Sequence, residues 1–293
     1  MEVIRTVSWM KEAARQARAE NHLVGLVPTM GALHEGHMTL VRRAKQECSR
    51  VFVSVFVNPK QFGPREDLAK YPRSLDSDAA KLEAAGVDLL FAPAPAEIYP
   101  PGFATYIAVE GISEGLEGGS RPGHFRGVAT VVAKLFQIAQ PNFAYFGRKD
   151  AQQARIVTRM TRDLDIDVEP VVCDIVREAD GLACSSRNAY LNPEERRAAT
   201  VLYRGLEAAR RQIARGERVA LEISEEVRRV LGQEKLARAD YVEVVDADTF
   251  EPAARLGGRA AYVLLAVFIG GTRLIDNLLV APEPGSDRLV VTL

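Results

Sequence analysis

Two histidines three residues apart, His34 and His37, lie in the glycine-containing segment PTMGALHEGHMTLVRRA, residues 28–44. The apolar run at residues 23–27 predicts a buried strand, and apolar residues recur with helical spacing after His37. The segment therefore predicts a turn from a strand into a helix, with His37 at or near the helix start. Unpaired N–H groups and a positive dipole favour an anion there, and glycine lets a phosphate approach the backbone. With 4 histidines in the chain, two in one turn favour phosphate binding by imidazoles over a chance pair of surface histidines.

Amide side chains follow a second predicted strand. The segment NPKQF, residues 58–62, comes directly after the apolar run at residues 51–57. Amides can bind a ligand without charge, because each offers a donor and an acceptor. A polar loop that caps a helix is an equally good interpretation of this segment alone.

A third segment, GRKDAQQAR at residues 147–155, follows the predicted strand at residues 143–146. Gly147 permits close backbone approach, and Lys149, expected on a solvent-facing loop, can reach a phosphate as a point charge. Asp150 can accept from a ribose or cap the next helix, and Gln153 shares its helix face. The alternative is an Asp cap beside a solvated lysine.

A fourth segment, READGLACSSRNAYL at residues 177–191, contains two serines followed by an arginine. Hydroxyl donors and a guanidinium suit a triphosphate or a pyrophosphate leaving group. The segment lies at a predicted domain junction, where a mobile lid is expected. A serine-rich turn that caps the helix at Pro193 is the alternative.

The elements that position these segments alternate between strands and helices. Strands are predicted at 23–27, 51–57, 87–91, 143–146 and 168–173, with helices from about 37, at 74–86, 127–139 and 151–164. This order predicts an α/β fold with a Rossmann-like, doubly wound parallel sheet, whose ligands bind at the carboxyl ends of the strands.

The pattern changes after residue 176, where helices at 193–215 and 220–231 precede strands at 241–245, 261–269 and 273–280. We therefore expect two domains, 1–175 and a smaller α+β domain at 176–293. The tail APEPGSDRLVVTL, residues 281–293, should leave through a Pro/Gly turn, and its last residues can be a strand or disordered.

Composition narrows the class of protein. A net charge of -1 argues against extended nucleic-acid binding, no apolar run approaches a membrane span, and the N-terminus is too charged for a signal peptide. Three scattered cysteines, Cys48, Cys173 and Cys184, favour a reducing compartment, and the cytoplasm is the default. A zinc site is a weak alternative for the histidines, because the helix lacks H-E-x-x-H. No P-loop is present either.

The H-x-G-H segment resembles the signature of nucleotidyltransferases and class I aminoacyl-tRNA synthetases, which attack an α-phosphate and expel pyrophosphate. The net charge weighs against a synthetase of the tRNA class. Over nearly the whole chain the sequence resembles the pantoate–β-alanine ligase family. The matching segments, in chain order, are PTMGALHEGH, NPKQFGPREDLAKYPR, RPGHFRGV, GRKDAQQ and DGLACSSRN.

The resemblance implies an ATP-dependent condensation of (R)-pantoate with β-alanine that gives pantothenate, AMP and diphosphate through pantoyl adenylate. It implies Mg²⁺ with the ATP, no protein metal ligand, small-molecule substrates only and a homodimer. The implied ATP site comprises Met30, Gly31, Ala32, Leu33, His34, Glu35, Gly36, His37, Gly147, Arg148, Lys149, Asp150, Val176, Cys184, Ser185, Ser186 and Arg187. The implied catalytic residues are His34, His37, Lys149, Ser185, Ser186 and Arg187, with His37 as proton donor.

Gln61 and Gln153 match the glutamines that hold pantoate in this family, and Gln61 also meets β-alanine. Cys184 stands where a larger apolar residue is expected and Arg148 where glutamate is common, and both are expected to act through backbone. Two rivals remain: a nucleotidyltransferase that uses a phosphorylated acceptor, and a non-catalytic nucleotide sensor.

Overall fold

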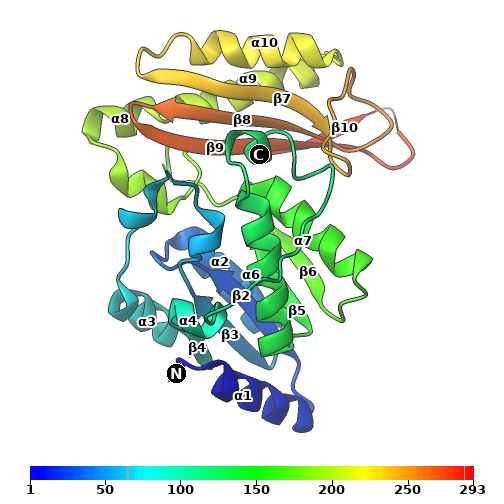
Figure 1. The fold of residues 1–293 in the computed structure, drawn as a ribbon. Helices are drawn as coiled ribbons and strands as arrows, with labels where there is room; N and C mark the ends of the chain where they lie inside the picture. Colours follow the sequence, from blue (N-terminus) through cyan, green and yellow to red (C-terminus); the bar gives the residue numbers. More distant parts are fainter. Residues whose placement is uncertain (65, 287) are drawn as a thin grey trace. The chain divides into compact units, whose positions relative to one another are not determined.

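The computed structural model describes residues 1–64, 66–286 and 288–293 (Figure 1). The chain forms two compact units, Met1–Asp174 and Ile175–Leu293. Arg65, which belongs to the second matching segment, and Asp287, in the C-terminal tail, lie outside the described residues. Of the helices that the structure describes, none combines the length and the apolar character needed to cross a membrane.

The first unit is built on a six-stranded sheet. Its strands are β1 (Glu2–Ile4), β2 (Val24–Thr29), β3 (Arg50–Val55), β4 (Leu89–Phe91), β5 (Phe143–Gly147) and β6 (Glu169–Cys173). The strands lie in the order β1-β4-β3-β2-β5-β6, and every neighbouring pair is parallel. The strand order reverses between β2 and β5, which makes their carboxyl ends the topological switch point of the sheet.

Helices cover both faces of this sheet. The longer ones are α1 (Val7–Ala19), α2 (Glu35–Glu47), α3 (Leu75–Ala84), α6 (His124–Ala139) and α7 (Ala151–Asp163). The short ones are α4 (Pro95–Ile98), α5 (Glu117–Ser120) and the 3₁₀ turns η1 (Pro59–Gln61), η2 (Asp67–Ala69) and η3 (Arg148–Asp150).

The alternation of side chains along the strands supplies one apolar core to each face of the sheet. Leu26 and Phe52 pack in a cluster with residues of α1, α6 and α7. Val27 and Val53, one residue further along each strand, pack in a second cluster with residues of α2 and α3. The predicted doubly wound parallel sheet is therefore confirmed.

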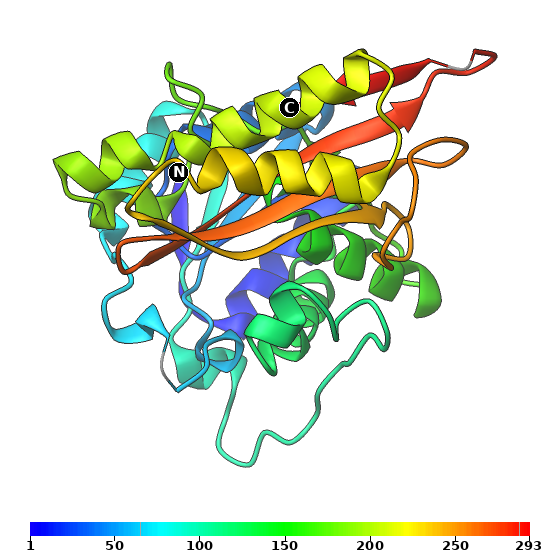
Figure 2. The same cartoon turned by 90° about the horizontal axis from the view of Figure 1, so that it is seen from above.

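The second unit is an antiparallel sheet with helices. Its strands β7 (Ala237–Asp246), β8 (Ala261–Ile269), β9 (Thr272–Pro282) and β10 (Leu289–Thr292) lie in the order β10-β9-β8-β7. Its helices are η4 (Ser186–Tyr190), α8 (Pro193–Ala198), α9 (Val201–Ala214) and α10 (Ala220–Leu231). Figure 2 shows α9 and α10, yellow-green and yellow, side by side over the orange and red strands, and a single apolar cluster joins them to the sheet. The predicted smaller α+β part is confirmed.

Four elements differ from the sequence-based prediction. The helix predicted at residues 193–215 is two helices, α8 and α9, separated by a turn in which the N–H groups of Thr200 and Leu202 donate to the carbonyls of Arg197 and Ala199, three residues earlier. Strand β1 and helix α1 were not predicted from the N-terminal segment. Helix α2 begins at Glu35 rather than at His37, because His34 is its N-cap.

Candidate active site

The turn after β2 connects the central strand of the sheet to helix α2. The Thr29 hydroxyl donates to the Ser54 carbonyl at 2.8 Å and accepts from the Gly31 N–H at 3.2 Å, which ties the turn to β3. Gly31 and Ala32 have φ values of 82° and 52°. Only glycine adopts this region without strain, so the backbone of Ala32 must be held there by its surroundings.

The two histidines form the N-terminal cap of α2. His34 Nδ1 accepts from the Gly36 N–H at 3.1 Å, and His37 Nδ1 accepts from the His34 N–H at 3.4 Å. The ring centroids are 4.1 Å apart. Since a nitrogen that accepts carries no hydrogen, each neutral ring holds its hydrogen on Nε2.

Burial, with His34 as the second cause, lowers the pKa of His37 to about 3, against the opposing effect of the Asp150 carboxylate. His37 is therefore a neutral hydrogen-bond donor at pH 7 rather than a cation. Lys149 also lowers the pKa of His37. Strands β2 and β5 are parallel neighbours, so the segments that follow them lie at the same edge of the sheet, as expected at the switch point.

Gln61, in η1, meets the same turn. Its Nε2 donates to the Met30 sulfur at 3.1 Å, and its Oε1 accepts from Asn58 Nδ2 at 3.0 Å. Asn58, 1% exposed, is oriented in turn by the Tyr99 hydroxyl, which donates to its Oδ1 at 2.8 Å.

A Cβ at Gly127 of α6 would lie 2.3 Å from the Lys60 carbonyl oxygen, so η1 can approach this helix only at a glycine.

A third histidine, His124, forms a hydrogen bond with the backbone of η1. His124 Nε2 accepts from the Arg121 guanidinium at 3.0 Å, so its Nδ1–H donates to the Gln61 carbonyl at 2.8 Å. Arg121 also pairs with Glu66 at 2.6 Å. Burial, with the Arg121 charge as the second cause, lowers the pKa of His124 to about 4. The backbone of Gln61 is therefore fixed by a neutral imidazole.

The segment after β5 forms η3 and the first turn of α7. The Lys149 side chain is 19% exposed and lies 3.6 Å from the Asp150 carboxylate, so the expectation of a solvent-facing lysine is wrong. Arg148, 3% exposed, pairs with Asp174 at 3.3 Å. Its guanidinium is thus enclosed in the unit, in keeping with a role through its backbone.

The two neighbouring glutamines of α7 differ. Gln152 is buried, and its side chain donates to the carbonyls of Ile112 and Gly115 at 2.7 and 3.0 Å and accepts from the Glu117 N–H at 3.1 Å. These bonds hold the Gln152 side chain to the loop before α6. Gln153 is partly exposed one turn beyond Asp150, which leaves it as the candidate ligand of the pair.

The remaining residues of the first segment take several positions. Gly36 and Leu33 belong to the backbone of the turn and the cap, whereas the Glu35 carboxylate pairs with Arg42 on the surface of α2. A cavity of about 600 Å³ lies beside the turn at the carboxyl ends of β3 and β4, and Met30 and Gly31 line it.

The serine and arginine motif belongs to the second unit. The Cys184 N–H donates to the Val176 carbonyl at 2.9 Å, which closes a hairpin between them. Ser185 caps η4 by accepting from the Arg187 N–H at 3.3 Å, and Ser186 is the first residue of η4.

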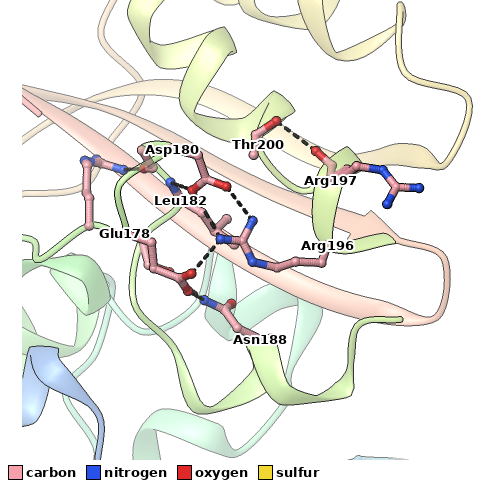
Figure 3. A network of polar contacts seen from close by, with 10 residues as sticks. Glu178, Asp180, Leu182, Asn188, Arg196, Arg197 and Thr200 are labelled. Atoms are coloured by element: carbon pink, nitrogen blue, oxygen red, sulfur yellow. Dashed lines mark hydrogen bonds and ion pairs between the residues drawn. The ribbon is translucent and has the colours of Figure 1, made fainter. Parts of the chain in front are cut away.

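Ion pairs attach this hairpin to the core of the second unit. The Arg177 guanidinium donates to both carboxylate oxygens of Asp276 at 2.7 and 3.0 Å. Figure 3 shows Arg196 of α8 between Glu178 and Asp180, at 2.5 and 2.8 Å. The same Glu178 accepts from Asn188 of η4 at 2.9 Å. The motif is therefore fixed to its own unit.

Two residues of α3 that shape the histidine turn were not predicted from the sequence. Asp78, 2% exposed, accepts from the N–H groups of Ala32 and Leu33, and Lys81 donates to the Leu33 carbonyl at 2.6 Å. One signal was available: Asp78 has the same helical spacing as the apolar residues Leu75 and Leu82, which puts a charge on the core-facing side of α3.

The model of the pantoate-beta-alanine ligase family matches residues 2–279. The chain belongs to this family. A pantothenate synthetase of Roseiflexus sp. (strain RS-1) is 57% identical over 277 residues, which cover 94% of this chain and 98% of the relative. The comparisons thus confirm the predicted family and, with it, an enzyme of the ligase class.

Solved structures agree with this assignment. The pantothenate synthetase of Thermus thermophilus is 48% identical with a TM-score of 0.88, covering 94% of this chain and 98% of that one. The pantoate-beta-alanine ligase of Francisella tularensis, solved with beta-gamma ATP and β-alanine, is 34% identical with a TM-score of 0.76, covering 94% and 97%. Both share the family fold with this chain.

Proposed function

We propose that this chain condenses (R)-pantoate with β-alanine at the expense of ATP, giving pantothenate, AMP and diphosphate through pantoyl adenylate. The family supports the reaction, and one observation carries it into this structure: His34 and His37 present two Nε2 donors at a helix start beside Lys149 and Asp150. Pantothenate, vitamin B5, is a precursor of coenzyme A, so the enzyme serves coenzyme A biosynthesis.

In the first step a pantoate carboxylate oxygen attacks the α-phosphorus of ATP, and diphosphate leaves. ATP activates the carboxylate, so no protein nucleophile is required. The site must hold the reactants in line and stabilise the negative charge that develops on the phosphates. Neutral imidazole donors, the Lys149 ammonium and the start of α2 meet this need. The family resemblance gives His37 the role of proton donor; because its ring is neutral at pH 7, we propose that its Nε2–H donates a hydrogen bond to a phosphate oxygen and keeps its proton.

Two glutamines are proposed to hold pantoate. Gln61 has its carbonyl oxygen engaged by Asn58, so the group it can turn to a ligand is its amide N–H, a donor suited to a carboxylate. A thioether is a weak acceptor, so the contact of Gln61 with Met30 gives way readily to such a ligand. Gln153 is proposed to meet pantoate from α7, and Gln61 to meet β-alanine as well.

We further propose that residues 1–175 bind ATP and pantoate and that residues 176–293 act as a lid domain. Ser185, Ser186 and Arg187 would supply donors to the leaving diphosphate, with Val176 and Cys184 next to the nucleotide. Exclusion of water protects the acyl adenylate while the β-alanine amine attacks its acyl carbon and AMP leaves.

Mg²⁺ is proposed to arrive with ATP, held by phosphates, water and one or two carboxylates. Asp150, the carboxylate that acts on His37, fits this part, and the ion would neutralise phosphate charge. Among the described residues, no three His, Cys, Asp or Glu side chains are grouped to hold a metal. We also propose a cytoplasmic homodimer that binds neither nucleic acid nor membrane.

Products formed from ATP, pantoate and β-alanine test the proposal. We expect stoichiometric pantothenate, AMP and diphosphate, identified by mass spectrometry. A nucleotidyltransferase of the same fold would instead attach AMP to a phosphorylated acceptor, and a sensor would bind ATP without turnover. Either outcome refutes the proposed reaction.

A further inference from the structure

Helix α3 presents two charged side chains to the histidine turn. The Asp78 carboxylate accepts from the Ala32 N–H at 2.9 Å with Oδ2 and from the Leu33 N–H at 2.8 Å with Oδ1. Lys81, one helical turn further, donates from its ammonium to the Leu33 carbonyl at 2.6 Å. The two side chains therefore bind donors and an acceptor of the same short backbone segment.

Burying the Asp78 carboxylate is unfavourable unless its hydrogen bonds to the turn compensate for the lost water. Asp78 is 2% exposed, and a buried carboxylate is tolerated only when hydrogen bonds replace its water. Both of its oxygens are used on the turn, which is what a carboxylate can do and an amide cannot, because an amide has one acceptor oxygen and one donor nitrogen.

The turn needs such support. Ala32 has a φ of 52°, a left-handed conformation that disfavours any residue with a Cβ. Met30 and Gly31 line the cavity of about 600 Å³, as does Asp78, so the packing on that side of the turn is incomplete. Hydrogen bonds from α3 take the place of the missing packing.

The histidine pair follows directly from this segment. Leu33, held at both its N–H and its carbonyl, immediately precedes His34, the N-cap of α2. The position of the His34 N–H, which His37 Nδ1 accepts, is thereby set by α3. Displacing the turn would break this cap and free both rings to change their hydrogen-bearing nitrogen.

We propose that Asp78 and Lys81 are positioning residues that hold the turn at residues 31–33, and so aim the Nε2–H groups of His34 and His37 at the phosphates of ATP. The inference rests on the proposed function for its catalytic consequence. The structural part of the proposal, that Asp78 and Lys81 fix the N-terminal cap of α2, does not depend on any substrate.

The catalytic test uses Asp78→Asn, which keeps the shape but turns a donor toward a backbone N–H. We expect about 10²-fold lower kcat for adenylate formation, the scale of a small displacement of reacting groups, with little change in the KM for pantoate. Lys81→Met should act in the same direction with a smaller loss. The matched control is Asp76→Asn, an exposed carboxylate in the first turn of the same helix, which should behave as wild type.

Imidazole ¹⁵N spectra of the substrate-free protein supply the second readout. Wild type should show Nε2–H rings for His34 and His37 and an Nδ1–H ring for His124, whose hydrogen bonds have the opposite arrangement. In Asp78→Asn and Lys81→Met only the His34 and His37 signals should change. His124 reports whether the fold is intact.

Unchanged His34 and His37 signals in both variants overturn the proposal, whether or not kcat falls. If Asp78→Asn fails to fold, as a changed His124 signal would show, Lys81→Met decides the same question with Asp78 in place. If wild type forms no adenylate, the proposed function fails. The spectra still test whether Asp78 and Lys81 hold the turn at residues 31–33.

Discussion

The turn after β2 in the first unit and the Val176–Cys184 hairpin in the second both carry residues of the proposed ATP site, but different forces hold them. The turn depends on hydrogen bonds among backbone groups and neutral imidazoles, anchored by the buried Asp78 carboxylate. The hairpin depends on arginine–carboxylate pairs, of which Arg177–Asp276 is buried and those of Arg196 are partly exposed.

The difference follows from what each segment must present. A turn that aims neutral donors gains from a fixed hydrogen position on each ring, which backbone N–H groups provide. A hairpin that only needs a firm attachment can use ion pairs, whose strength depends on burial rather than on a particular tautomer. Loss of a hairpin contact should therefore lower stability, whereas loss of a turn contact should lower activity.

The largest expected effect is on stability in the second unit. Arg177→Met leaves the Asp276 carboxylate, 2% exposed, without its cation, and removing one partner of a buried pair costs about 3–5 kcal/mol. We expect this loss in the free energy of unfolding, measured by chemical denaturation. Arg229→Met, which removes a surface pair with Glu226 on α10, is the control and should change little. Equal losses in both variants would contradict the assignment of strength to burial.

The next effect is on activity in the first unit. His37→Ala and His34→Ala should each lower adenylate formation about 10²-fold or more, the scale of removing a preorganised donor. His34→Ala should also cost about 1 kcal/mol of stability, because it removes the cap of α2. Rates of diphosphate release and thermal unfolding check both. Activity within a few-fold of wild type in both variants would remove the phosphate role.

The neighbouring glutamines of α7 test the contrast between activity and stability on one helix. Gln153→Ala should cost about 1–3 kcal/mol of pantoate binding, roughly ten- to hundredfold in affinity, with ATP binding nearly intact. Gln152→Ala should lower stability instead, because its side chain bonds the loop before α6. Calorimetric titration of both ligands separates the two. If Gln153→Ala lost affinity for ATP and kept its affinity for pantoate, the assignment of Gln153 to the pantoate part of the site would be wrong.

A further prediction concerns the pH dependence of stability. The folded-state pKa of His124 is lowered to about 4 and that of His37 to about 3, so the unfolded chain binds more protons below pH 6.5. The free energy of unfolding should therefore fall as the pH drops from about 6.5 toward 4, by up to about 1.4 kcal/mol per pH unit for each histidine.

His124→Asn, whose amide can still donate to the Gln61 carbonyl, should roughly halve this slope between pH 5 and 6.5. Denaturation at a series of pH values measures it. An identical slope in wild type and variant would show that His124 is not held neutral.

Much of this molecule could be predicted from its sequence. The strands before the site segments are continuous apolar runs, and His34, His37, Lys149 and Gln153 stand directly after them, where a doubly wound sheet gathers its ligands. The turn could be placed to within two residues, although no feature of the segment indicated that His34 itself is the cap.

The supports of the site could not be predicted in the same way. Asp78 and Lys81 bond a turn more than forty residues earlier in the chain, and no local pattern encodes that pairing. The exposure of Lys149 depends on the packing around η3 rather than on its sequence neighbours. Strand β1, with 3 residues, is too short to carry a periodic signal, and its pairing with β4 decides its state.

The most direct test of the account is a rapid-quench measurement with ATP and pantoate in the absence of β-alanine. We expect a burst of about one diphosphate per active chain, with adenylate retained on the enzyme, and AMP only after β-alanine is added. The burst should be absent in His37→Ala. Formation of ADP and phosphate, or no diphosphate until β-alanine is present, would contradict the two-step reaction and the role of the histidine pair in its first step.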